Sequence, residues 1–271
     1  MGDAHPTRLF YQERNNDMKS KYSLFGLAII IFAGLLTASS YSKIDPQTCV
    51  GMWLFDEGKG DIATDSSGSG NDGDFMGDPR WIDGKFGDAL EFDGGGSYVN
   101  IPNSENMNSD SFTICLWFQP SQLRIQGLVD KTPAPHWRIF MNSPAGAIEF
   151  DALPGEIANI TTPVTAIGRW DHVAATYDAG TETAKIYFNG NLSQQAANVN
   201  MNNNSPVNIN IASPENSRFN GIIDEVAIFN VVLEAQDIQT LMNKGLKETI
   251  NPSAVALSGK LVTTWANIKA R

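Results

Sequence analysis

A loop rich in oxygen-bearing side chains has the composition of a calcium site. Residues 65–74 consist entirely of Asp, Ser, Gly and Asn. Such a loop can wrap carboxylates and backbone carbonyls around calcium, which takes oxygen ligands at high coordination number. The same four residue types are also those that form tight turns. The composition therefore indicates either a cation site or a series of turns.

A second group of side chains has the chemistry of carbohydrate binding. Trp137, Arg138 and Asn142 follow a loop that contains Pro133 and Pro135. An aromatic ring can stack on the face of a sugar while polar side chains bond to its hydroxyls. We take Trp137, Arg138 and Asn142 as candidate ligand-binding residues, with an ordinary structural role for Trp137 as the alternative.

The histidines offer no catalytic arrangement. His5, His136 and His172 are the three histidines of the chain. None belongs to a visible Ser, His and Asp set, and no His or Cys pair has the spacing of metal ligands. His172 lies in an apolar run, where a buried, hydrogen-bonded ring is the expectation.

The charge and composition exclude some partners. The chain has a formal net charge of −11, a sequence pI near 4.7 and 10% aromatic residues. Its aromatic content and modest charge suit an ordered globular protein. Nucleic acid and anionic membrane surfaces are not expected partners, because they require a surplus of Lys and Arg.

The amino end has the layout of a secretory signal. Residues 22–42 carry no charge, and the apolar residues 24–36 follow Lys19 and Lys21. This apolar stretch is shorter than the ~20 residues that a transmembrane helix needs. We expect residues 1–42 to be an extension and cleaved signal peptide, with an uncleaved anchor as the alternative. The true start is Met1 or Met18.

Export makes a disulfide between the two cysteines chemically permissible. Cys49 and Cys115 allow one pairing. The sequence does not show that their Cα atoms come within bridging distance, and Cys115 lies in an apolar run where a free buried thiol is common. We treat the disulfide as tentative.

Short strands dominate the exported part. Runs with period-two alternation, separated by Gly, Asn, Asp or Pro, recur in the manner of a sandwich or jelly roll. One helix is expected at residues 234–244, ending at Gly245. Residues 247–271 read as a linker and a short tail. The clearest predicted strands are residues 50–55, 89–92, 98–101, 112–118, 147–150, 172–177, 184–188, 207–211 and 222–229.

Several motifs together resemble a known family. The segments GMWLFDEG (51–58), GDALEFDG (87–94), FTICLW (112–117), WDHVA (170–174) and GIIDEV (221–226) resemble laminin-G-like domains of the concanavalin A-like lectin/glucanase superfamily. The resemblance covers about residues 50–246. It implies one domain, residues 43–246, folded as a two-sheet antiparallel jelly-roll sandwich with adjacent first and last strands. It also implies that Trp53, Trp117 and Trp170 are core residues.

The resemblance also bears on metal binding. Laminin-G-like relatives often hold a structural calcium where such a loop meets the last strand. This implies Asp65, Asn71 and, from the opposite side, Asp224 as calcium ligands. The alternative for Asp224 is a carboxylate that accepts hydrogen bonds from backbone amides.

The superfamily includes glycoside hydrolases, which place two carboxylates on one strand. Glu149 and Asp151 are the nearest candidates, but Pro154 and Gly155 should end the strand before Glu156. We therefore expect no enzyme activity.

The sequence predicts a secreted binding or adhesion module, without catalysis, that recognises a glycan or an extracellular protein and holds a structural calcium. The alternatives are a membrane-anchored surface module without a small ligand and, less favoured, a degenerate glycosidase.

Overall fold

The described part of the chain begins at Ile44 and ends at Ile250. The computed structural model describes residues 44–131, 137–152, 159–201, 203, 206–212 and 217–250. All of these residues belong to one unit of the chain, Lys43–Arg271. The predicted signal peptide and the tail from residue 251 lie outside the described residues. In the described part, no helix has the length and apolar character needed to cross a bilayer.

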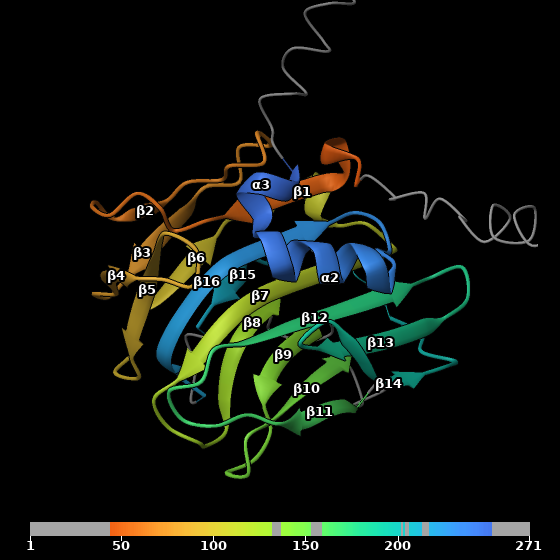
Figure 1. Cartoon of the computed structure of the whole chain (residues 1–271). Helices are drawn as coiled ribbons and strands as arrows, with labels where there is room; N and C mark the ends of the chain where they lie inside the picture. The colour runs from red at the N-terminus through yellow and green to blue at the C-terminus, as the bar shows by residue number, and fades with distance from the viewer. Residues whose placement is uncertain are drawn as a thin grey trace, which may run out of the picture. The chain divides into compact units, whose positions relative to one another are not determined.

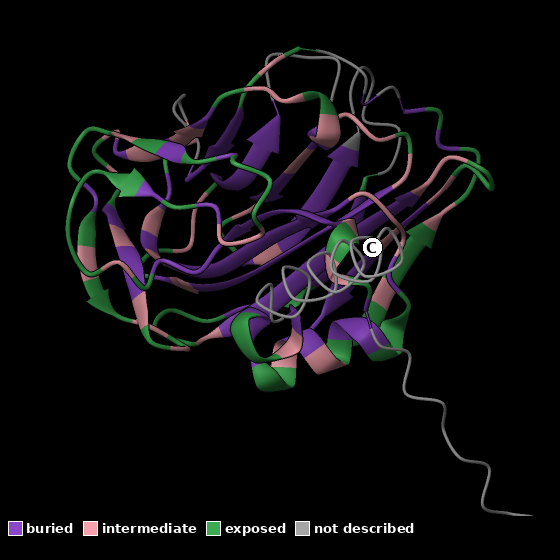
Figure 2. Cartoon of the chain, turned by 90° about the horizontal axis from the view of Figure 1, so that it is seen from above, coloured by how far each residue is buried: buried purple, intermediate pink, exposed green. Residues whose placement is uncertain are grey.

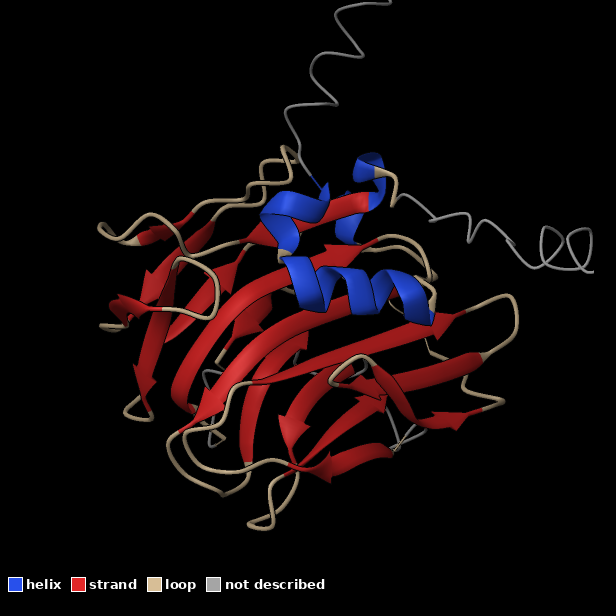
Figure 3. Cartoon of the chain, in the orientation of Figure 1, coloured by secondary structure: helices blue, strands red, loops and turns tan. Residues whose placement is uncertain are grey.

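Two antiparallel sheets make up this unit, in agreement with the predicted jelly-roll sandwich (Figure 1, Figure 3). Each sheet has eight strands among the described residues. Sheet A contains β1 (Cys49–Trp53), β4 (Arg80–Asp83), β5 (Asp88–Asp93), β7 (Phe112–Pro120), β12 (Asp171–Asp178), β13 (Thr183–Phe188), β14 (Asn191–Ala196) and β16 (Asn220–Phe229). Sheet B contains β2 (Ile62–Ala63), β3 (Gly73–Met76), β6 (Tyr98–Ile101), β8 (Gln126–Lys131), β9 (Trp137–Met141), β10 (Ala147–Ala152), β11 (Ile160–Val164) and β15 (Ile209–Ile211).

The strand order brings the two ends of the domain together. Sheet A runs β14-β13-β12-β7-β16-β5-β4, and sheet B runs β11-β10-β9-β8-β15-β6-β3-β2. Strand β1 pairs with the carboxyl half of β16, where Trp53 lies opposite Val226. The first and last strands are therefore adjacent, as predicted.

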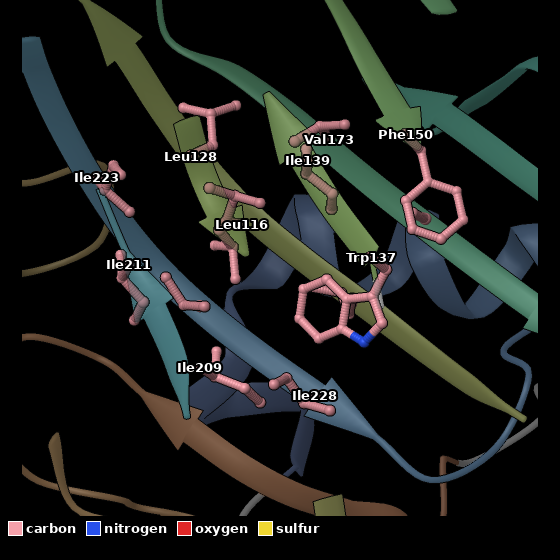
Figure 4. Close-up of a cluster of buried hydrophobic side chains, with 14 of the residues drawn as sticks. Leu116, Leu128, Trp137, Ile139, Phe150, Val173, Ile209, Ile211, Ile223 and Ile228 are labelled. Atoms are coloured by element: carbon pink, nitrogen blue, oxygen red, sulfur yellow. The ribbon is translucent and has the colours of Figure 1, made fainter. Parts of the chain in front are cut away.

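The main core lies between the sheets. In β7, Phe112, Ile114, Leu116 and Phe118 are all buried in this core, because alternate side chains of a strand share a face. Figure 4 shows Leu116 among isoleucine, leucine and aromatic side chains from both sheets. The central strands are buried along most of their length, whereas the edge strands β4 and β14 and many loops are largely exposed (Figure 2).

A second core covers the outer face of sheet A. Helix α2 (Ala235–Lys244) packs Ile238 and Leu241 there, and it ends at Gly245 with φ +79°, as predicted. Helix α3 (Leu246–Ile250) follows at once, and its Leu246 and Ile250 are buried. Figure 1 shows both helices lying across this sheet. The folded domain thus continues through Ile250, past the predicted boundary at Leu246. Two short 3-10 helices, η1 (Pro46–Thr48) and η2 (Glu105–Met107), complete the elements.

The tentative disulfide is not formed. Cys49 and Cys115 are both free and buried. Strand β16 lies between their strands, with β1 and β7 pairing to its two sides. Two strand spacings are about 9.6 Å, and a disulfide requires Cα atoms within ~7 Å. The prediction of a bridge was therefore wrong.

Candidate functional site

In the acidic loop at residues 65–74, the Asp65 carboxylate stabilises the turns by accepting hydrogen bonds from backbone amides. Asp65 Oδ1 accepts the backbone amides of Met52 and Ser67, each at 2.9 Å, and Asp65 Oδ2 accepts the amide of Asn71 at 2.9 Å. The side-chain amide of Asn71 donates to the carbonyl of Val50 at 2.6 Å. Asp65 and Asn71 are brought together, as the predicted site required.

Asp224 lies in a different network. Its Oδ2 accepts the backbone amides of Lys85 at 2.8 Å and Phe86 at 3.0 Å. Its Oδ1 is buried without a hydrogen-bond partner among the described residues. The pKa of Asp224 is raised to about 7, chiefly by burial and in smaller part by the nearby Asp56 carboxylate, against the lowering effect of the backbone amides that it accepts.

The three predicted calcium ligands do not form one set. Asp65 and Asn71 bond β1, whereas Asp224 bonds the loop after β4. Across the described ranges, no group of three or more His, Cys, Asp or Glu side chains is arranged to hold a metal ion. The alternatives describe both acids: Asp65 forms turns, and Asp224 accepts hydrogen bonds from backbone amides. Calcium binding itself stays a prediction.

Trp137 is a core residue rather than a surface ligand-binding residue. It is 1% exposed, and its ring lies in the core beside Ile139 and Phe150 (Figure 4). Its Nε1 donates to Asn203 Oδ1 at 3.0 Å. Because β9 alternates, Trp137, Ile139 and Met141 face inward. The predicted binding role of Trp137 was wrong, and the structural alternative is confirmed.

Arg138 lies on the outer face of sheet B. Its guanidinium pairs with Asp151 Oδ2 at 2.8 Å and lies 4.2 Å from the centre of the Phe140 ring. Asn142 donates to Glu149 Oε2 at 2.6 Å. Both predicted residues are therefore engaged within the fold, and their ligand-binding role stays a prediction. The two hydrolase candidates, Glu149 and Asp151, are the acids that these contacts occupy.

An open groove lies at the side of the sandwich, where edge strands β11 and β14 meet. Two adjoining hollows share Pro163, Phe188 and Asn189. We call these two hollows together the edge groove. The backbone amide of Thr161 donates to Gln194 Oε1 at 2.9 Å and so ties the two edge strands together.

The first hollow has a volume of about 480 Å³ and carries the aromatic and charged side chains of the edge groove. It lies against sheet A and the end of α2. Trp170 is half-buried there, and Lys85 and Arg169 are exposed. Its remaining lining residues are Trp117, Val164, Asp171 and Met242.

Buried Asp171 organises the wall of this hollow. Its Oδ2 accepts Thr165 Oγ1 at 2.5 Å and Arg169 Nε at 2.8 Å, and its Oδ1 accepts Asn189 Nδ2 at 2.8 Å. Asn189 Oδ1 in turn accepts the backbone amide of His172 at 2.9 Å. These bonds fix Arg169 and Asn189 in place, and such preorganisation lowers the entropic cost of binding.

The second hollow has a volume of about 570 Å³ and is uncharged. The turn that forms one end has φ +47° at Asn189 and +75° at Gly190, the conformation that an Asn-Gly pair favours. In the sequence, the Asn189-Gly190 pair predicts a tight turn, because both positions tolerate positive φ, and these angles confirm it. The remaining lining residues are Thr161, Thr162, Asn191, Leu192, Ser193 and Gln194.

Trp117 lies on the floor of the first hollow, on the outer face of sheet A. It packs edge-on against His172 at 5.3 Å, and Lys85 Nζ lies 4.4 Å above its ring. Burial lowers the pKa of His172 to about 3, so the imidazole is neutral. Trp117 Nε1 and His172 Nδ1 find no hydrogen-bond partner in the described part of the chain. Trp117 and His172 are buried, as expected, whereas Trp170 is partly exposed and lines the site.

Sequence reasoning did not find this groove. Lys85, Arg169 and Asn189 are far apart in the chain and share no motif. The Asn-Gly pair predicts a turn, but no local pattern indicates that this turn lies beside β11.

A two-sheet jelly roll with an open groove at its side defines a lectin-like sandwich. Residues 93–239, more than half of the chain, match the family model described as Concanavalin A-like lectin/glucanases superfamily (Laminin_G_3). The chain belongs to this superfamily.

Solved structures with the same fold are binding domains. The binding domain of Paraclostridial Mosquitocidal Protein 1 has a TM-score of 0.63 and 17% identity, with 73% of this chain and 52% of that chain covered. Domain 4 of AbnA, an extracellular GH43 arabinanase from Geobacillus stearothermophilus, in complex with arabinotriose, has a TM-score of 0.61 and 20% identity, with 72% and 98% covered. The binding domain of botulinum neurotoxin DC in complex with rat synaptotagmin II has a TM-score of 0.57 and 18% identity, with 73% and 52% covered.

These likenesses establish the fold. The chain spans about half the length of the toxin binding domains, so their ligands do not transfer to it directly. No curated protein matches the sequence.

Proposed function

We propose that this chain is a secreted, non-catalytic binding module that holds a glycan in the edge groove. The observation that carries this is the pairing of a half-exposed aromatic ring, Trp170, with the amide and hydroxyl side chains of Asn191, Ser193 and Gln194 along one open groove. Rings that stack on sugar faces and polar groups that bond hydroxyls are the two requirements of sugar binding.

The arabinanase domain supports this proposal. It was solved with a bound oligosaccharide and is covered over nearly its whole length. A jelly roll of this size is therefore sufficient for glycan binding in that protein.

A glycan array with native protein and two variants tests the proposal. Trp170→Ala should weaken binding about fivefold, because lost ring contact of this kind is worth on the order of 1 kcal/mol. Trp81→Ala is the matched control: Trp81 is also half-buried, but it lies on β4, at the opposite edge of sheet A. Failure of the native protein to capture any glycan, or equal binding by Trp170→Ala, would contradict the proposal.

A protein ligand is the second candidate, and one observation favours it. Strand β14 is an edge strand with mostly exposed residues, and an edge can accept an added strand from a peptide. In that case Trp170→Ala would have little effect, and Pro substitution on the free edge of β14 would abolish binding.

Secretion rests on the predicted signal at residues 1–42. A mature amino terminus near Ser42, found by mass spectrometry, would support it. An intact segment would favour the membrane-anchored alternative.

A further inference from the structure

The exposed charged residues of the edge groove have the opposite sign to the net charge of the chain. The chain carries a formal net charge of −11. Yet the two exposed charged side chains that line the groove, Lys85 and Arg169, are both cationic. The acid of the groove, Asp171, is 1% exposed and is already engaged by Thr165, Arg169 and Asn189.

Lys85 and Arg169 both have N–H groups left to donate to a ligand. Arg169 uses Nε for Asp171 and one terminal nitrogen for the carbonyl of Val164 at 2.9 Å, and a guanidinium has five N–H groups. Lys85 is held by its backbone amide to Asp224, while its ammonium lies over the Trp117 ring. Among the described residues, the Lys85 ammonium belongs to none of the ion pairs.

The two ends of the groove therefore differ in chemistry. The Lys85 and Arg169 end attracts a negative group, and charge-assisted hydrogen bonds of this kind are about twice as strong as neutral ones. The other end offers the side chains of Thr161, Asn191, Ser193 and Gln194, which suit hydroxyl groups. A ligand that satisfies both ends is an oligosaccharide with at least one neutral and one carboxylated unit.

We infer that the edge groove is selective for acidic oligosaccharides and seats the sugar carboxylate between Lys85 and Arg169. This inference rests on the proposed glycan binding. It assigns Lys85 and Arg169 as specificity-determining residues and Trp170 as the stacking residue. The proximity of the Trp117 ring adds an apolar floor next to the seated carboxylate.

Calorimetric titration of the full chain with matched sugars tests the inference. Sialyllactose should bind about tenfold more tightly than lactose, the gain expected for one charge-assisted contact at an open site. A trisaccharide that carries a uronate on lactose in place of the sialate distinguishes a uronate from a sialate as the preferred acid. The preference should decrease with added salt, because exposed charges are screened.

Two charge-removing variants locate the effect. Lys85→Gln should reduce the acidic-to-neutral ratio to about twofold, through a loss of affinity for sialyllactose. Arg169→Gln should also reduce the acidic-to-neutral ratio. If the loss of the ion pair between Arg169 and Asp171 unfolds the domain, Lys85→Gln alone tests the inference. Lys185→Gln is the control, because Lys185 lies on β13 and does not line the groove.

The outcomes separate the inference from the proposed function. Equal affinity for acidic and neutral sugars, with binding lost in Trp170→Ala, would overturn the inference and leave glycan binding in place. Absence of binding to any glycan would overturn both. Tight binding of a hexaglutamate peptide that survives Trp170→Ala would also overturn the inference, because charge alone would then be sufficient.

Discussion

Asp224 on the last strand holds the backbone of Lys85, which belongs to a loop 139 residues earlier in the chain. The same loop places the Lys85 ammonium over the Trp117 ring in the edge groove. A buried carboxylate therefore fixes one wall of the candidate binding site. This relationship links the stability of the last strand to the shape of the groove.

The buried acids of β16 make the stability of the domain dependent on pH. Burial raises the pKa of Asp224 from 3.8 to about 7 and that of Glu225 from 4.5 to about 8. Since the folded state binds these protons more tightly than the unfolded state, the stabilising contribution is complete below pH 4. It is lost as the pH rises toward 8.

We expect Asp224→Asn to reduce this slope, because Asn keeps a carbonyl oxygen for the Lys85 and Phe86 amides and carries no charge. The free energy of unfolding from urea titrations between pH 4 and pH 8 is the measurement. At pH 8 the variant should match or exceed native stability, by roughly 1 to 3 kcal/mol at most. Asp88→Asn is the control, because Asp88 is a half-buried carboxylate on β5. An unchanged slope in Asp224→Asn would show that Asp224 ionises normally.

Helix α3 should be required for stability, whereas the residues after it should not. A chain that ends at Ile250 should keep the native melting temperature. A chain that ends at Gly245 removes the buried Leu246 and Ile250, and the Leu246 amide that donates to Glu225 Oε2. It should lose on the order of 3 kcal/mol or more, because apolar burial and a buried hydrogen bond disappear together.

Thermal unfolding of the two shortened chains, followed by circular dichroism, distinguishes these cases. Equal melting temperatures would show that α3 contributes nothing. Destabilisation of the chain that ends at Ile250 would assign the tail to the fold.

Asp65 should stabilise the domain with or without calcium. Asp65→Ala removes the acceptor for three backbone amides, and the expected loss is about 2 kcal/mol or more. The loss should be the same in EDTA and in several millimolar calcium if turn formation is the whole role. A native melting temperature that rises in calcium, in an initially metal-free domain, together with a larger loss for Asp65→Ala in calcium than in EDTA, would restore the predicted calcium site. The gain expected in that case is ~1 kcal/mol.

The two cysteines should be unreactive in the folded protein. Burial raises the pKa of Cys49 to about 12, and burial also raises the pKa of Cys115. A thiol reagent should therefore modify neither residue under native conditions and both residues in concentrated urea without reductant. Failure to detect two thiols in urea would mean that a disulfide forms after all.

Strand patterning determined the sandwich because its signal is local. In residues 112–118, apolar side chains alternate so that Phe112, Ile114 and Leu116 reach one core, and the alternation is visible without any partner. The helix at residues 234–244 was visible for the same reason, since its apolar face and Gly245 are close in sequence.

Strand β8 is an element that the local sequence pattern does not predict. All of its residues are buried, yet Gln126, Asp130 and Lys131 are polar. Lys131 Nζ donates to Asn108 Oδ1 at 2.6 Å and to the carbonyl of Asn203 at 2.8 Å. Because distant segments satisfy these groups, a polar sequence can form a buried strand, and composition alone does not predict it.

The sequence by itself determined the fold class, the paired first and last strands and the Asn-Gly turn, since motifs and periodicity carry that information. Only the tertiary structure decided that Trp137 is buried, that the cysteines are separated by β16, and that Asp65 and Asp224 bond different loops. It also formed the edge groove, whose residues come from β7, β11, β12, β13, β14, α2 and the loops beside them. A binding surface of this kind depends on which sheet edges lie side by side. That arrangement is determined by pairing between strands that are far apart in the sequence.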